Sequence, residues 1–277
     1  MTKGGSRLSG FGLIRVAWRE LWNRAQVSLI LLAGFWYSLT TGVYQSFVAS
    51  RLGPALPSAL KTTNPLQPST AYTSAVQHLP PTLLIRLVLV YATLILIVSP
   101  FALAGLYGGV GGTLSGRGHS GPVVFFRYAY VGFWRGLSVV LATLAIMTVM
   151  AGIVVGTLIA TASLGPISSI IIVIMVLFFI VLLLSFLLYW LGAIFYGDES
   201  TVQGLRHAVG WIFHHLWFTV RFGLLLLGLL ITVSVLLVVL LLIPVLGALV
   251  VAVAGGMVVP AYMAVLASVY YRSAIDL

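Results

Sequence analysis

The sequence contains no cysteine and very little charge. Without cysteine, a disulfide framework, a thiolate metal site and a cysteine nucleophile are all excluded. Only 6% of the residues are charged, whereas soluble domains average about 25%. By contrast, 61% are hydrophobic, and the mean hydropathy is +1.17. A soluble chain of 277 residues could not bury that much apolar surface. The composition therefore predicts a protein that lies in lipid.

Long apolar runs predict an all-α, polytopic bundle of six transmembrane helices. Each run is long enough for a hydrocarbon core that needs about 20 helical residues. Short, uncharged segments with a proline, at 163–166 and 243–247, separate runs that would otherwise be too long. A four-span arrangement with two very long helices is the alternative. The predicted spans are 27–49, 82–109, 136–162, 167–196, 219–243 and 246–271.

A basic and aromatic pattern occurs three times before the apolar hairpins. Arg15, Arg127 and Arg206 each follow an apolar residue, and each precedes an alanine two positions later and then aromatic residues. This composition is typical of a helix that lies at the membrane–water interface. We therefore predict one membrane domain, 1–277, made of three units. They are an interfacial helix in 1–26 with the hairpin 27–109 and its outer loop 50–81, a second helix and hairpin in 110–196, and a third in 197–277.

The distribution of basic residues predicts that both termini are cytoplasmic. Eleven of the 14 Lys and Arg fall on the side of the termini, and only Arg51, Lys61 and Arg86 fall on the other. All four acids lie on the side of the termini. The formal net charge is +10 at pH 7. In a soluble protein this charge would indicate a nucleic-acid partner, but here the topology explains it and no nucleic-acid partner is expected. We interpret the first run as an uncleaved anchor, with cleavage near Ala49 as the alternative.

Glycine pairs four residues apart predict close packing between helices. Gly105 with Gly109, and Gly152 with Gly156, have this spacing, which lets helix backbones approach each other in a bilayer. Residues 108–112 are so rich in glycine that we expect a bent helix end there.

Two prolines lie inside predicted spans. Pro100 and Pro260 are expected to kink their helices, since proline cannot donate a backbone hydrogen bond. The carbonyl groups released in this way must find partners on neighbouring helices or in water.

Residues suited to catalysis or metal binding are scarce. No Asp or Glu lies within a predicted span, so a proton relay lacks its usual groups. His207, His214 and His215 have helical spacing but too few carboxylates nearby to complete a metal shell, and we interpret them as interfacial. Residues 116–121 match a dinucleotide-binding pattern, but no strand precedes them. We expect no cofactor, no bound metal and no enzymatic activity, although an intramembrane enzyme stays open.

Three stretches, 100–107, 125–134 and 196–217, resemble the membrane domain associated with bacterial glycerophosphoryl diester phosphodiesterases. The similarity covers about residues 80 to 277. The phosphodiesterase barrel, which would supply its own acids and histidines, is missing from the chain. The resemblance thus implies a bacterial plasma-membrane protein and not an esterase.

These observations favour a non-catalytic membrane protein that serves as a scaffold, a lipid-associated accessory or a partner subunit. The alternative is a permease-like transporter, or a transporter subunit, for an uncharged or hydrophobic solute. It would need a polar cavity lined by residues such as Thr148, Ser185 and Thr232. Arg15, Arg127 and Arg206 are predicted to form a basic ring that binds anionic lipid or an acidic face of a cytoplasmic partner. Ordinary anchoring of the chain is the competing interpretation.

The predicted topology can be tested by labelling single cysteines, because the native chain has none. Ser58→Cys should react with a membrane-impermeant thiol reagent in intact cells. Ser120→Cys and Ser200→Cys should react only after the membrane is permeabilised. Labelling of Ser120→Cys from outside would contradict the orientation.

Overall fold

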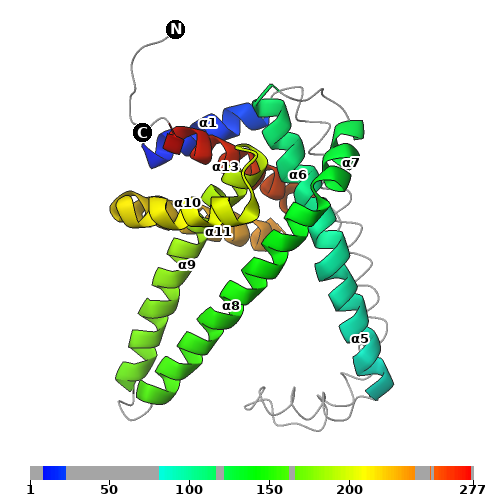
Figure 1. Ribbon diagram of the computed structural model, residues 1–277. Coiled ribbons are helices and arrows are strands. Elements are labelled where there is room, and N and C mark those ends of the chain that lie inside the picture. Colours follow the sequence, from blue (N-terminus) through cyan, green and yellow to red (C-terminus); the bar gives the residue numbers. More distant parts are fainter. Residues whose placement is uncertain are drawn as a thin grey trace.

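The computed structural model describes residues 9–22, 81–116, 122–161, 166–240, 250 and 253–275. Within these ranges the regular elements are all helices (Figure 1). The α-helices are α1 (Gly10–Leu21), α5 (Pro81–Thr93), α6 (Ser99–Leu114), α7 (Pro122–Val131), α8 (Phe133–Thr161), α9 (Pro166–Phe195), α10 (Thr201–His214), α11 (Leu216–Leu240) and α13 (Val259–Ile275). Two π-helical turns, η1 (Leu94–Val98) and η3 (Ala254–Val258), precede α6 and α13.

Four helical segments are long and apolar enough to cross a membrane. They are Val88–Leu114, Phe133–Thr157, Ile170–Phe195 and Leu216–Leu240, and they correspond to the second through fifth predicted spans. The predicted span 27–49 lies outside the described residues. The predicted span 246–271 is described only in part, and the helix at its end, α13, is not among the four. The fold is therefore all-α with four candidate membrane helices.

The third and fourth predicted spans form two separate helices that pack against each other. α8 ends at Thr161 and α9 begins at Pro166, which confirms the predicted break between them. In Figure 1 both helices run away from the rest of the bundle and meet at their far ends, while α5 and α6 form a second arm. Proline is well suited to the first turn of a helix, where its missing N–H would have no helical partner.

Short helices occur where the three basic and aromatic segments were predicted. α1, α7 and α10 each contain one of the segments, and α7 and α10 directly precede the long helices α8 and α11. Pro122 begins α7, and the Ser200 hydroxyl accepts a hydrogen bond from the Gln203 N–H at the start of α10. Figure 1 shows α1 and α10 lying across the end of the bundle rather than along α8 and α9.

Both prolines inside the expected spans directly follow a π turn. Pro100 comes two residues after η1, and Pro260 comes two residues after η3. Next to Pro100, the Ser99 N–H donates to the Leu94 carbonyl five residues earlier, and the Ser99 hydroxyl donates to the same carbonyl at 3.0 Å. The wider turn thus gives the Leu94 carbonyl two donors, both from Ser99, just before the proline. A π turn therefore lies ahead of each of the two prolines that were predicted to kink their helices, and the kinks themselves stay a prediction.

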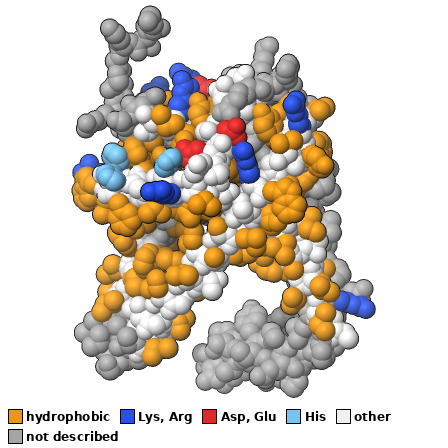
Figure 2. Space-filling model, in the orientation of Figure 1, with side chains coloured by type: hydrophobic (Ala, Val, Ile, Leu, Met, Phe, Trp, Pro, Cys, Tyr) orange, Lys and Arg blue, Asp and Glu red, His pale blue; other side chains and the backbone are white. Residues whose placement is uncertain are grey.

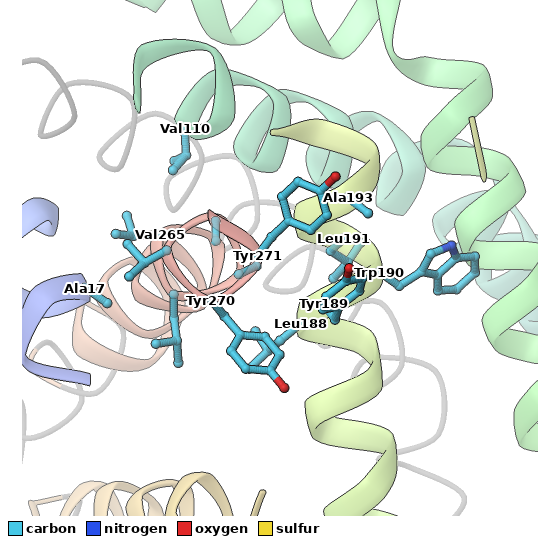
Figure 3. Packing of buried hydrophobic residues seen from close by; sticks show 14 of the residues in the cluster. Ala17, Val110, Leu188, Tyr189, Trp190, Leu191, Ala193, Val265, Tyr270 and Tyr271 are labelled. Atoms are coloured by element: carbon cyan, nitrogen blue, oxygen red, sulfur yellow. The ribbon is translucent and has the colours of Figure 1, made fainter. Parts of the chain in front are cut away.

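The centre of the described bundle is α13, which buries 11 of its 17 residues. It packs against α9, α1 and α6. Figure 3 shows Ala17 of α1, Val110 of α6 and Tyr189 of α9 around it, with Tyr270 and Tyr271 on the side of α13 that faces α9. The rings of Tyr189 and Tyr271 meet edge to face, with centroids 5.3 Å apart. Such aromatic pairs contribute about 0.5–1.5 kcal/mol beyond the area that they bury.

Helix backbones touch where glycine leaves out a side chain. A Cβ atom added to Gly192 of α9 would collide with the carbonyl oxygen of Ala267 on α13. One added to Gly223 of α11 would collide with the carbonyl oxygen of Val181 on α9. Small residues allow backbones this close in membrane bundles, so both glycines fix the spacing of α9 from its neighbours.

The two predicted glycine pairs differ in their surroundings. Gly105 lies against the ring of Phe125 on α7, in a close contact between helices, and Gly109 is buried in α6. Gly152 and Gly156 are exposed on α8, and no described atom lies within 4 Å of a Cβ added to either. Within the described chain, this second pair makes no close contact with another helix, and its predicted packing stays a prediction. The spacing is right, but that face of α8 meets no other described helix.

Residues 108–112 are not a bent helix end, which corrects the prediction. They lie inside α6, which continues as a regular helix to Leu114, and all five are buried. Gly108 and Gly112 face Tyr128 of α7, whose side chain occupies the space that larger residues would need. Glycine here serves the packing of α7 on α6.

We expect Gly192→Ala to lower the thermal stability of the detergent-solubilised protein. The added methyl group must push α13 away from α9, and overpacking of this kind costs about 1–3 kcal/mol. Gly152→Ala is the matched control, since it also places alanine in a helix but meets open space. It should leave the melting temperature unchanged or raise it, because alanine favours a helix by up to about 1 kcal/mol over glycine. Equal effects of the two changes would contradict this account of the packing.

Candidate functional site

Charged and histidine side chains gather at one end of the molecule. In Figure 2 they lie over the part formed by α1, α7 and α10, whereas the arms below are covered by hydrophobic side chains, with one basic group on α5. We call the part made of α1, α7, α10 and the turn 196–200 the charge-bearing end. The described acids, Glu20, Asp198 and Glu199, all belong to it.

The turn between α9 and α10 is held in one conformation by its own backbone. Asp198 has a φ of 60°, in the left-handed region that aspartate tolerates better than most residues. The Gly197 N–H donates to the Gly192 carbonyl at 3.1 Å, and the Glu199 N–H donates to the Ala193 carbonyl at 3.1 Å. These bonds satisfy carbonyl groups at the end of α9 and direct the two adjacent carboxylates toward different helices.

The two carboxylates join four helices. Asp198 forms an ion pair with Arg135 of α8. Glu199 accepts a hydrogen bond of 2.6 Å from the Tyr271 hydroxyl on α13, and its other oxygen lies 3.0 Å from Nδ1 of His207 on α10. We call this set of five residues the polar junction. It connects the end of α9 to α8, α10 and α13.

The start of α10 is fixed by further hydrogen bonds. The hydroxyl groups of Thr201 and Ser138 are 2.7 Å apart, which ties α10 to α8. The indole N–H of the buried Trp190 donates to the Thr201 carbonyl at 3.0 Å, which ties α10 to α9. With each carboxylate already engaged, the polar junction is built to hold helices together. In the described ranges, no three His, Asp or Glu side chains come together as they would around a metal ion.

An apolar groove of about 470 Å³ opens beside α1 at the charge-bearing end. Its walls come from α1 and α11, and its remaining surface comes from η3 and the start of α13. The lining residues from α11 lie within the candidate membrane span Leu216–Leu240. The lining consists of Phe11, Ile14, Arg15, Trp18, Leu229, Val233, Val258, Val259 and Tyr262.

Arg15 is the one charged residue in the lining of this groove. Its side chain is exposed, and no described acid forms an ion pair with it. The helix that carries it is fixed in place, because the Tyr262 hydroxyl donates to the Ile14 carbonyl at 3.2 Å and the Trp18 ring meets Tyr262 edge to face. An apolar groove whose cation has no ion pair with a described acid can bind an amphipathic anion.

A second cavity, of about 400 Å³, lies between α6, the α7–α8 junction and the end of α9. Glycines 108, 112 and 132 form part of its wall, beside the Tyr128 side chain. Its charged lining residues are Arg135 and Asp198, which already pair with each other. A ligand there would have to compete with that ion pair, so the groove beside α1 is the better candidate site.

The arginines predicted to form a ring lie on three helices with different neighbours. Arg15, Arg127 and Arg206 are all exposed. α1 packs on α13, α7 packs on α6, and α10 packs on α9, and none of the three packs extensively on another. Of these arginines, only Arg15 lines the groove.

Sequence reasoning missed the polar junction. The sequence analysis placed Asp198 and Glu199 only among the four acids on the side of the termini, because a local pattern cannot show partners that are far away in the chain. Their partners Arg135 and Tyr271 are 63 and 72 residues away. Composition offered one signal that these residues are important, because Asp198 and Glu199 are adjacent and make up half of all the acids in the chain.

Comparisons of the chain with protein-family models, curated proteins and solved structures find no match. The resemblance to the membrane domain of glycerophosphoryl diester phosphodiesterases stays a prediction. The function is therefore inferred from the composition and geometry of the chain itself.

Replacing Tyr271 by Phe should lower the free energy of unfolding by about 1–3 kcal/mol, the range for losing a hydrogen bond to a charged group. Tyr130→Phe, on a side chain that is 81% exposed, should change it by less than about 0.5 kcal/mol. Denaturant or thermal unfolding in detergent measures both. In the background of Glu199→Gln, the Tyr271→Phe change should cost less than in the parent. Additive effects would show that the two side chains do not interact.

Proposed function

We propose that this chain is a non-catalytic, multi-pass protein of the bacterial plasma membrane that acts as a lipid-associated scaffold or accessory subunit. It has six membrane spans, cytoplasmic termini, and α1, α7 and α10 as interfacial helices at the inner headgroup layer. The observation that carries the proposal is the apolar groove with the free Arg15 at the charge-bearing end. A groove of this kind suits a phospholipid better than a soluble metabolite, because nearly all of its lining is hydrocarbon.

The side chains exposed on α1 and α10 support their place in the headgroup layer. α1 buries Leu13, Ala17 and Leu21 against the bundle, while Phe11 and Trp18 are exposed next to its arginines. α10 likewise buries Gly204, Ala208 and Ile212 and exposes apolar as well as basic groups. Exposed aromatic rings are unfavourable in water, and arginines are unfavourable in hydrocarbon. The interface accommodates both.

A filled aromatic core supports a scaffold rather than a solute path at this end. The Phe222 ring stacks on Tyr270 with centroids 4.6 Å apart, and Tyr189 stacks on Trp211 at 5.6 Å. These rings join α9, α10, α11 and α13. Such contacts hold these four helices to one another at this end and favour a scaffold.

Hydroxyl groups that a transport cavity would use are already engaged within the bundle. Ser185 donates to the Thr219 carbonyl at 3.1 Å across the α9–α11 contact. Thr148 and Thr232 each donate at 2.8 Å to a carbonyl one turn earlier in their own helices. Such bonds satisfy polar groups in lipid and leave fewer of them to line a path for a solute.

The proposal predicts that the protein prefers anionic lipid. Purified protein in phosphatidylglycerol nanodiscs should melt at a higher temperature than in phosphatidylcholine nanodiscs, because ligand at about 100 times its Kd stabilises the native state by about 2.7 kcal/mol. The variant with Arg15, Arg127 and Arg206 all changed to Gln, with its insertion verified, should lose most of that difference. Equal melting temperatures of the parent in both lipids, or solute flux into proteoliposomes, would contradict the proposal.

A further inference from the structure

We infer that the groove beside α1 holds one acyl chain of an anionic phospholipid, with the lipid phosphate paired to Arg15. This rests on the proposed lipid association and adds the binding site, its stoichiometry and the parts of the lipid that are recognised. A volume of about 470 Å³ lies within the usual range of ligand pockets, about 300–1,000 Å³.

The order of groups along the groove matches the order of groups in a phospholipid. Arg15 lies on α1 at the charge-bearing end, whereas Leu229 and Val233 lie within a candidate membrane span. A phosphate at Arg15 would therefore place the attached chain along the apolar lining, toward the hydrocarbon. The exposed Trp18 belongs to the same wall, and tryptophan favours the headgroup level of a membrane.

The charge of Arg15 determines which lipids are preferred, and the groove determines where the acyl chain binds. A chain that leaves the bilayer for an apolar groove gains little from the hydrophobic effect, because lipid tails are as apolar as the protein surface. The phosphate can pair with a guanidinium through two parallel hydrogen bonds. Binding should therefore depend on the charge of Arg15, and equally on the groove being open to the chain.

A second copy of this chain fits the groove less well than a lipid does. It would have to bring an acid to Arg15, because an apolar cover would bury an unpaired cation. The described acids are already engaged. Glu20 lies 3.9 Å from Arg19, Asp198 pairs with Arg135, and Glu199 binds Tyr271 and His207. An anionic lipid supplies the missing negative charge directly.

Two pairs of variants separate the charge from the groove. Arg15→Gln removes the cation of the groove, and Arg206→Gln removes an exposed cation of α10 that does not line it. Val233→Trp fills the groove from α11. Leu236→Trp is its matched control, since it puts the same ring on the same helix at a side chain that is 60% exposed and does not line the groove.

The measurement is the number of phosphatidylglycerol molecules held by each protein in native mass spectra during a lipid titration in mild detergent. The parent, Arg206→Gln and Leu236→Trp should hold one lipid more tightly than the rest. Arg15→Gln and Val233→Trp should bind that lipid at least about fivefold more weakly. Phosphatidylcholine should bind the parent as weakly as phosphatidylglycerol binds Arg15→Gln. Because Arg15 is exposed, its variant tests the inference even if Val233→Trp fails to fold.

The inference would be overturned if Arg15→Gln bound phosphatidylglycerol as tightly as the parent, or if Val233→Trp behaved like Leu236→Trp. If either result were found while the parent still preferred anionic lipid, the proposed function would stand, but the lipid would have to bind at another site. A parent without any such selectivity would refute the proposed function itself. A change in oligomeric mass for Val233→Trp, with no loss of lipid, would identify a second copy as the occupant and also overturn the inference.

Discussion

In the hydrocarbon core of a membrane, backbone N–H and C=O groups must find their partners within the protein. That constraint accounts for the helices throughout the described chain and for the π turns ahead of Pro100 and Pro260. It also accounts for hydroxyls such as those of Thr148 and Thr232, which donate to carbonyls of their own helices. Polar groups in the arms form hydrogen bonds within their own helices. The charged side chains gather instead at the charge-bearing end (Figure 2).

The helix α13 connects the features of that end. Tyr262, near its start, lines the groove and donates to the backbone of α1, while Tyr271, near its end, donates to Glu199 in the polar junction. Between them, Ala267 touches α9 at Gly192, and Tyr270 stacks on Phe222 of α11. The wall of the groove and the turn between α9 and α10 are therefore parts of one packed unit.

The scarcity of acids shapes the electrostatics of the protein. Asp198 and Glu199 neutralise Arg135 and bind Tyr271 and His207, so each described carboxylate there has a structural partner. Arg15 is left without an acidic partner among the described residues. Exposed Arg127 and Arg206 also have no ion pair with a described acid, but of these three arginines only Arg15 lines the apolar groove. The proposed binding of an anionic lipid rests on this combination of an apolar lining and a cation.

Composition and apolar run length by themselves predicted an all-helical chain with helices long and apolar enough to cross a membrane, and the structure has four such helices among the described residues. Local signals predicted the break between α8 and α9, where Pro166 begins the second helix, since helix ends depend on neighbouring residues. Local patterns could not show that Gly105 has a neighbour on another helix while Gly152 meets no described residue, or that α13 is the centre of the described bundle. Nor could they pair Glu199 with Tyr271 or place Arg15 on a groove. Those relations join residues far apart in the chain, and only the packing of the helices decided them.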